Sequence, residues 1–157
     1  MPAVIACQRL ARGFSFTADG WLYPLLPLLV ALYKPSIAWP FFVTLLVGYS
    51  LERLLYLAIK KHFKRCRPPN AIPGFYSVIQ ASDEFSFPSG HTSASFFAVT
   101  TLLLFFPGGA MAFAYLWCVS VALSRIVLGV HFPLDTVAGA TLGVSTALLV
   151  FNQLSFY

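Results

Sequence analysis

Residues 86–97 read SFPSGHTSASFF, and their turn-forming and polar side chains stand at the start of a long apolar run. Ser89 is a favourable residue to cap a helix, and Gly90 lets another group approach the backbone closely. The first N–H groups of the following helix are unsatisfied and carry partial positive charge, so they can seat an anion. A simple capped helix explains the stretch equally well, so its meaning depends on the rest of the chain.

The composition is that of a membrane protein. Of the 157 residues, 59% are hydrophobic and only 10% are charged, and the mean hydropathy is +0.79. A soluble domain has about 25% charged residues. A bilayer requires apolar runs of about 20 residues, which satisfy their backbone hydrogen bonds as helices. We therefore predict an all-α integral membrane helical bundle that forms a single domain over residues 1–157.

Five apolar runs are expected to cross the membrane, at 20–33, 37–59, 91–106, 109–129 and 133–151. The first is short and contains two prolines, which membrane helices tolerate when neighbours satisfy the freed carbonyl groups. Residues 4–16 are predicted to form a short interfacial helix with Arg9 and Arg12 on its polar side, or alternatively a sixth span. With five spans, the N-terminus, the loop 60–90 and the turn near 130–133 share one face of the membrane.

Three polar segments lie on that face, where helices enter or leave the membrane: KKHFKRCRPPN (60–70), PSGH (88–91) and SRIVLGVHFPLD (124–135). If the helices bundle, the three can converge on one cleft. Cations beside a span are often topology signals or lipid anchors, which is the default interpretation for Lys61, Lys64 and Arg65. Arg125 instead lies inside an apolar run, where a cation usually faces a partner or a cavity.

His131 and Asp135 are four residues apart and can share one face of a helix. The carboxylate could accept a hydrogen bond from Nδ1, which leaves Nε2 with a free lone pair and prepares the imidazole as a nucleophile or base. A purely structural pair that caps the helix is the alternative. Lys60, Arg67 and Arg125 would add cations that bind phosphate oxygens. With His91 and His131, the set predicts a phosphoryl-transfer site that requires no metal.

The three segments together resemble the type 2 phosphatidic acid phosphatase family of membrane lipid phosphatases, which is related to bacterial acid phosphatases and vanadium haloperoxidases. Its signatures K-x6-RP, PSGH and SR-x5-H-x3-D match Lys60 to Pro68, Pro88 to His91 and Ser124 to Asp135, a core of residues 60–135. The resemblance implies that His131 forms a phosphohistidine, that Asp135 orients it and that His91 is the general acid. The implied phosphate cradle consists of Lys60, Arg67, Ser89, Gly90 and Arg125.

The implied function is a metal-independent, cofactor-free phosphatase acting on a membrane lipid such as undecaprenyl diphosphate, phosphatidylglycerol phosphate, phosphatidate or a phosphate of lipid A. A lipid phosphotransferase with the same intermediate remains an alternative, as does a non-enzymatic protein that binds anionic lipids. A vanadium-dependent peroxidase is disfavoured because those relatives are soluble. The expected partners are the lipid substrate and the bilayer, with no nucleic acid, and the oligomeric state stays open.

The expected location is a bacterial inner membrane, with the site facing the periplasm as the family resemblance implies. The positive-inside rule favours the opposite orientation, because the loop after the second span is rich in Lys and Arg. We favour the family's orientation because several of these cations have a role at phosphate. Family members commonly have six spans.

Glu52 and Arg53 lie within the second span, and Arg53 shares a helix face with Lys60, seven residues further on. We expect a structural ion pair between Glu52 and Arg53. The alternative is that Arg53 steers Lys60 or binds the second phosphate of a diphosphate lipid.

Overall fold

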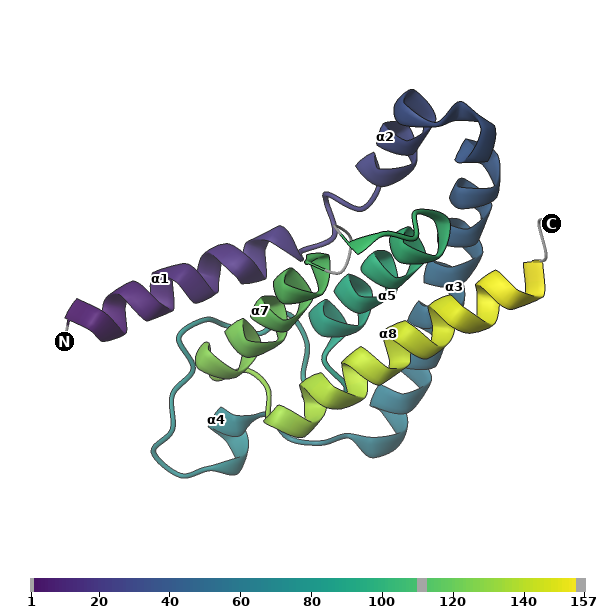
Figure 1. Ribbon diagram of the computed structural model, residues 1–157. Coiled ribbons are helices and arrows are strands. Elements are labelled where there is room, and N and C mark those ends of the chain that lie inside the picture. The colour runs from purple at the N-terminus through teal and green to yellow at the C-terminus, as the bar shows by residue number, and fades with distance from the viewer. Residues whose placement is uncertain (1, 110–112, 155–157) are drawn as a thin grey trace.

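The computed structural model describes residues 2–109 and 113–154, and the regular elements within these ranges are helices (Figure 1). The longer helices are α1 (Pro2–Thr17), α2 (Leu25–Tyr33), α3 (Ala38–Phe63), α5 (Gly90–Phe105), α7 (Ala114–Val127) and α8 (Pro133–Leu154). A 3₁₀ turn, η1 (Pro35–Ile37), precedes α3, and a single helical turn, α4 (Pro68–Ala71), follows it. The predicted all-α class is confirmed.

Within residues 2–109 and 113–154, two helices are long and apolar enough to cross a membrane, namely η1 with α3 (Pro35–Phe63, 29 residues) and α8 (22 residues). Helices α5 and α7 are apolar but shorter, with 16 and 14 residues. The predicted number of spans is therefore not confirmed and stays a prediction. Residues 110–112, which belong to the predicted fourth span, lie outside the described residues.

The predicted first span, 20–33, is wrong in its extent. Helix α2 begins only at Leu25 and has nine residues, which is about 14 Å at 1.5 Å per residue and about half the thickness of the hydrocarbon core. A turn occupies the preceding positions, where Gly20 has a φ of +99°, a left-handed conformation that favours glycine. The predicted N-terminal helix, 4–16, is present as α1, with Arg9 exposed.

Helix α8 packs closely against α5 because small residues face the contact. Gly139 and Gly143 are four residues apart. A Cβ on Gly139 would collide with the backbone of Ser89, the N-cap of α5, and a Cβ on Gly143 would collide with the backbone of Ser93 in α5. Glycines at this spacing let the backbones of two membrane helices approach each other. A hydrophobic core lies further along the bundle and consists of Val30, Phe41, Leu45, Phe97 and Ala147.

The end of α3, the start of α5, the end of α7 and the start of α8 lie at one end of the bundle (Figure 1). The turn between α2 and α3 and the end of α8 lie at the other. Hydrogen bonds join the segments at the first end: the Ser86 N–H donates to the Arg65 carbonyl at 2.8 Å, and the Ser89 N–H donates to the Asp135 carbonyl at 2.8 Å. The three polar segments are therefore brought together, as the sequence predicts.

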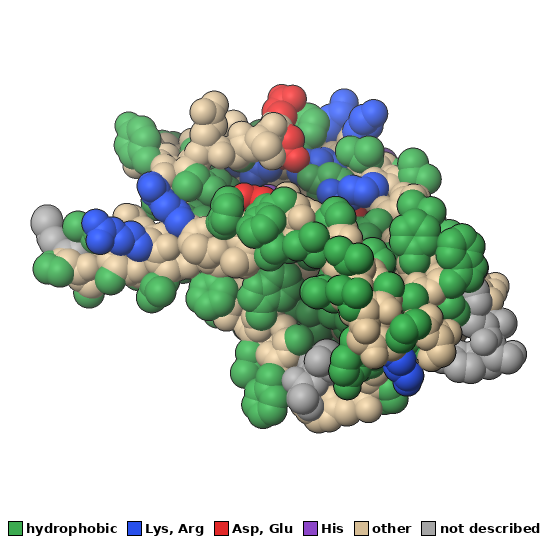
Figure 2. Space-filling view, turned by 90° about the horizontal axis from the view of Figure 1, so that it is seen from above, with side chains coloured by type: hydrophobic (Ala, Val, Ile, Leu, Met, Phe, Trp, Pro, Cys, Tyr) green, Lys and Arg blue, Asp and Glu red, His purple; other side chains and the backbone are tan. Residues whose placement is uncertain are grey.

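Apolar and charged side chains also lie mainly on different parts of the surface (Figure 2). Figure 2 shows a broad hydrophobic area, whereas the side chains of Lys, Arg, Asp and Glu gather mainly toward one side of the view. Many large apolar side chains on the bundle helices are more than half exposed, including Leu28, Trp39, Leu54, Leu116 and Val137. Such a surface suits contact with lipid and not with water.

Candidate active site

A cavity of about 360 Å³ opens at the end of the bundle where the polar segments meet. Five of the predicted site residues line it: Arg67, Gly90, His91, Arg125 and His131. They come from the segment after α3, the first turn of α5, the end of α7 and the α7–α8 loop. One small oxyanion can therefore face groups from all three signature segments.

His131 lies in the loop between α7 and α8 and is 4% exposed. Its Nε2 lies 3.5 Å from Nη1 of Arg67, whereas its Nδ1 lies 3.6 Å from Oδ2 of Asp135, at ion-pair distance but too far for a hydrogen bond. The predicted hydrogen bond to Asp135 is therefore not formed here. The carboxylate is already engaged, because Oδ2 accepts from the Phe132 N–H and Oδ1 from Arg65, each at 2.8 Å.

The surroundings of His131 keep its imidazole neutral. Burial disfavours the charged form and lowers its pKa to about 4, against the opposing effect of Asp135 and with help from Arg67 and Arg125. A neutral imidazole has the lone pair that a nucleophile needs. The Nε2 atom lies on the Arg67 side of the ring.

Asp83, in the loop between α4 and α5, holds two of the predicted phosphate-binding cations. Lys60 donates to its carboxylate at 2.6 Å, and Arg67 donates both to the carboxylate and, at 2.9 Å, to the Asp83 carbonyl. Tyr56 donates a further hydrogen bond at 2.9 Å. Partial burial opposes ionisation of the carboxyl, but the hydrogen bonds from Lys60 and Arg67 outweigh it and lower the pKa of Asp83 to about 2. A carboxylate thus occupies part of the predicted anion seat.

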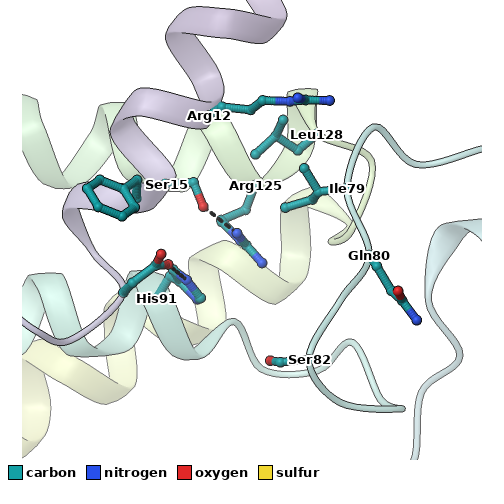
Figure 3. A pocket seen from close by; sticks show the side chains of 10 residues that line it. Arg12, Ser15, Ile79, Gln80, Ser82, His91, Arg125 and Leu128 are labelled. Carbon is teal, nitrogen blue, oxygen red and sulfur yellow. Dashed lines mark hydrogen bonds and ion pairs between the residues drawn. The ribbon is translucent and has the colours of Figure 1, made fainter.

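Helix α1 and the residues after it supply partners to His91 and Arg125. Nε2 of His91 lies 2.8 Å from Oδ1 of Asp19, and Nη1 of Arg125 donates to the hydroxyl of Ser15. Figure 3 shows His91, Arg125 and Ser15 around a second cavity of about 580 Å³, with Arg12 at its edge. His91, Arg125 and Asp19 also line the first cavity, so the two are neighbours.

Three predicted site residues do not line the first cavity. Lys60 is buried and paired with Asp83, and Asp135 is fully buried beneath His131. Ser89 is fully buried, and its hydroxyl accepts a hydrogen bond from Thr92 at 2.9 Å. The first turn of α5 therefore meets the cavity through Gly90 and His91, and the binding of phosphate by Ser89 stays a prediction.

Sequence reasoning missed Ser15, Asp19 and Asp83. Each contacts its partner across a long stretch of chain, and none belongs to a motif or has a distinctive spacing to the residue it binds. The local sequence around them contains no signal that could have found them. By contrast, the predicted ion pair of Glu52 and Arg53 is present, with Nε of Arg53 2.6 Å from the Glu52 carboxylate.

Known proteins with similar sequences act on lipid phosphates. The chain is 30% identical over 143 residues to "Probable lipid phosphate phosphatase beta" of Arabidopsis thaliana, which covers 74% of this chain and 67% of that protein. It is 32% identical over 101 residues to "Undecaprenyl-diphosphatase" of Sulfolobus acidocaldarius, covering 64% of this chain and 49% of the relative. These names confirm the predicted enzyme class, a hydrolase of lipid phosphates.

The fold also matches a solved structure. The crystal structure of Aquifex aeolicus LpxE superimposes with a TM-score of 0.77 at 23% identity, over 92% of this chain and 85% of that one. The family model of the PAP2 superfamily matches residues 37–156, which include all three signature segments and every predicted site residue. The chain therefore belongs to the PAP2 superfamily.

Proposed function

We propose that the protein removes the terminal phosphate from a membrane lipid phosphate or diphosphate through a covalent phosphohistidine on His131. The observation that carries this proposal is the common cavity of Arg67, His91, Arg125 and His131, in which the imidazole of His131 is neutral. Two guanidinium groups offset the charge of the phosphoryl oxygens, and the neutral histidine supplies the attacking lone pair.

The proposed reaction has two steps. Nε2 of His131 attacks phosphorus, the bond from phosphorus to the bridging oxygen breaks, and His91 donates its proton to that oxygen. Water then attacks the phosphohistidine, His91 accepts its proton, and the phosphorus–nitrogen bond breaks to release phosphate and free His131. Asp135 holds the first turn of α8 and keeps a negative charge near Nδ1.

The bilayer determines how the substrate reaches this cavity. The chain is an integral membrane protein with apolar helices. We place its single phosphatase domain in a bacterial inner membrane with the cavity on the periplasmic side. A lipid headgroup then enters from the membrane surface while its chains stay in the hydrocarbon. Undecaprenyl diphosphate, phosphatidylglycerol phosphate, phosphatidate and lipid A phosphates all have this form.

Phosphate release by the purified protein tests the proposal. In detergent with a chelator and no added metal, the protein should release phosphate from at least one of these lipids, and vanadate should inhibit. His131→Ala should lower the rate by at least about 10³-fold, and ³²P from a labelled substrate should remain on the wild-type protein after alkaline denaturation.

The control variant is His62→Ala, because His62 is exposed and lies outside the cavity. Label on the protein with transfer to a lipid acceptor, and no free phosphate, would identify a phosphotransferase instead. Full activity of His131→Ala would exclude the phosphohistidine, and lipid binding without turnover would favour the non-enzymatic alternative.

A further inference from the structure

Arg53 lies between the candidate active site and an apolar groove. It lines the cavity that contains Arg67, His91 and His131, and it also lines a neighbouring groove of about 380 Å³ between α2 and α3. Tyr23 and Tyr49 are likewise shared by the two. A ligand that occupies both spaces must therefore pass Arg53.

The Arg53 guanidinium is held in place by Glu52 through only two of its three nitrogens. Its Nε and Nη2 each donate to the Glu52 carboxylate at 2.6 Å, and Glu52 is fully buried and also accepts from Ser93. The guanidinium carbon lies 4.1 Å from the centre of the Tyr56 ring. Nη1 has no hydrogen bond with another described residue, and the side chain is 43% exposed. A held guanidinium with free N–H groups suits a phosphate oxygen.

The aromatic ring of Tyr56 lies beside both Arg53 and Lys60. The Tyr56 hydroxyl accepts from Lys60 and donates to Asp83 at 2.9 Å, and Nζ of Lys60 lies 4.6 Å from the centre of the same ring. Arg53 also lines the same cavity as Arg67, Arg125 and His131, so one ligand with two phosphoryl groups can face all four side chains.

The groove beyond Arg53 is lined mainly by apolar side chains, which suit a lipid chain. Apart from Gly20, Ser50 and Arg53, its walls are aromatic, aliphatic or proline side chains, at Tyr23, Pro24, Pro27, Phe42, Leu45, Leu46 and Tyr49. Phe42 and Leu46 are 40% and 57% exposed, so the groove opens on the apolar outer surface. An alkyl or prenyl chain in this groove would bury apolar area at both surfaces.

We propose that the preferred substrate class is a lipid diphosphate, with Arg53 bound to the phosphate that stays on the lipid and the chain lying in the α2–α3 groove. This inference rests on the proposed function. Along the path, the terminal phosphate meets Arg67, Arg125 and His131, the second phosphate meets Arg53, and the chain continues between α2 and α3. The leaving group is then a lipid monophosphate, and a lipid with one phosphate leaves Arg53 without an anionic partner.

Two substrates with the same chain test the inference. Phosphate release from farnesyl diphosphate and farnesyl monophosphate in detergent gives a ratio of kcat/KM values, which should favour the diphosphate by about tenfold or more in the wild type. The double variant Glu52→Gln with Arg53→Gln removes the guanidinium without leaving a buried carboxylate unpaired, and should lower the ratio by about tenfold. Arg53→Lys, which keeps the charge but loses the fork, should lower it less.

The exposed Arg9 provides the matched control, and Arg9→Gln should keep the wild-type ratio. An unchanged ratio in the double variant would overturn the inference, while phosphate release itself would leave the proposed function standing. A folded wild-type protein that hydrolyses neither farnesyl lipid but releases phosphate from another membrane lipid would overturn this inference alone. Release from none of the lipids would contradict the proposed function and, with it, this inference.

Competition by soluble anions gives a second readout that needs only the wild type and Arg53→Lys. Inorganic pyrophosphate should inhibit more strongly than inorganic phosphate in the wild type, and Arg53→Lys should reduce that difference. Equal inhibition by the two anions in the wild type would contradict the second phosphate site. If pyrophosphate itself is hydrolysed as efficiently as farnesyl diphosphate, the groove contributes nothing and the lipid part of the inference fails.

Discussion

His131 combines burial with a cationic neighbourhood, and both features disfavour the imidazolium. Its pKa, lowered to about 4, is below the ordinary value of 6.5. The neutral, nucleophilic form therefore persists as the pH falls through 6.5 and is lost only as the pH falls through about 4. The neutral protonation state of His131 therefore suits attack on phosphorus.

We predict that His131 titrates near pH 4 in the ligand-free protein. The chain has three histidines, so ring ¹³C chemical shifts followed against pH in detergent give three curves. The curve that disappears in His131→Gln belongs to His131. A midpoint near pH 6.5 for that curve would contradict the structural basis for a neutral nucleophile.

The Asp83 carboxylate pairs with two cations that are predicted to bind phosphate. Because its pKa is about 2, it remains ionised throughout the neutral range and competes with phosphate for Lys60 and Arg67. We predict that Asp83→Asn binds phosphate and vanadate more tightly, by on the order of 1 kcal/mol or about fivefold, since the side chain is partly exposed. The inhibition constants of the two oxyanions measure the effect.

The neighbouring Glu84→Gln removes an equal charge from an exposed position of the same loop and serves as the control. Weaker oxyanion binding by Asp83→Asn would mean that the carboxylate positions the two cations and does not compete for their ligand.

Residue types and spacing were enough to predict that Arg67, Arg125 and two histidines meet, but not which side chains pair with them. The signature residues lie at helix ends, so the location of Arg67, His91 and His131 at one cavity follows from the order of the spans. The contact between Asp83 and Arg67 depends on the path of an irregular loop, which no periodicity describes. The predicted bond from His131 to Asp135 failed for a related reason, because Arg65 and a backbone N–H engage the carboxylate first.

The contact between α5 and α8 connects the fold to the site. Gly139 and Gly143 let the two helices approach, and the same contact allows the Ser89 N–H to reach the Asp135 carbonyl. The start of α5, with His91, is thereby held beside the start of α8, which begins two residues after His131. Extra side-chain volume at these glycines would have to separate the helices.

We predict that Gly143→Ala lowers stability in detergent by about 1–3 kcal/mol, the usual range for overpacking of a tight contact. The new Cβ would collide with the Ser93 carbonyl, which is backbone and cannot turn aside. Thermal unfolding followed by circular dichroism measures the shift. Gly13→Ala in α1 is the control, because a Cβ there meets no atom within 4 Å. Equal midpoints for the two variants would show that the α5–α8 contact tolerates a wider separation.

The starts of three helices were predictable from the long apolar runs, whereas α3 and α8 extend beyond the predicted ends at 59 and 151. Helices α3, α5 and α8 begin within one residue of the predicted spans, because long apolar runs in a bilayer can only be helical. The predicted first span failed at Gly20 and the turn after it, where conformational freedom interrupts an otherwise apolar stretch. Sequence alone also could not assign α1 its contacts with α7, because amphipathic residues on a helix suit either a membrane surface or a protein neighbour.

At the scale of the whole molecule, one end of the bundle contains the cavity and the cationic segment after α3. Our orientation places this end on the periplasmic side, against the positive-inside rule. Cys66 is exposed in that segment and is adjacent to Arg67. Its reactivity therefore reports which side of the membrane the candidate site faces.

We predict that a membrane-impermeant maleimide labels Cys66 in intact spheroplasts of a bacterium that produces the variant Cys7→Ser with Cys118→Ser. Lys34→Cys in a chain without other cysteines is the matched control, because Lys34 is exposed at the turn between α2 and α3, at the other end of the bundle. That position should react only after the membrane is opened. The reverse pattern would place the cavity in the cytoplasm.

Ser15 and Asp19 lie before the part of the chain that the family model matches, yet they contact Arg125 and His91. Detachment of α1 would remove a hydroxyl from one of these groups and a carboxylate from the other at the same moment. The remaining helices could stay folded while catalysis stopped. The rate of turnover therefore depends on whether α1 is packed in place. Activity would be lost before a spectroscopic signal of unfolding appears.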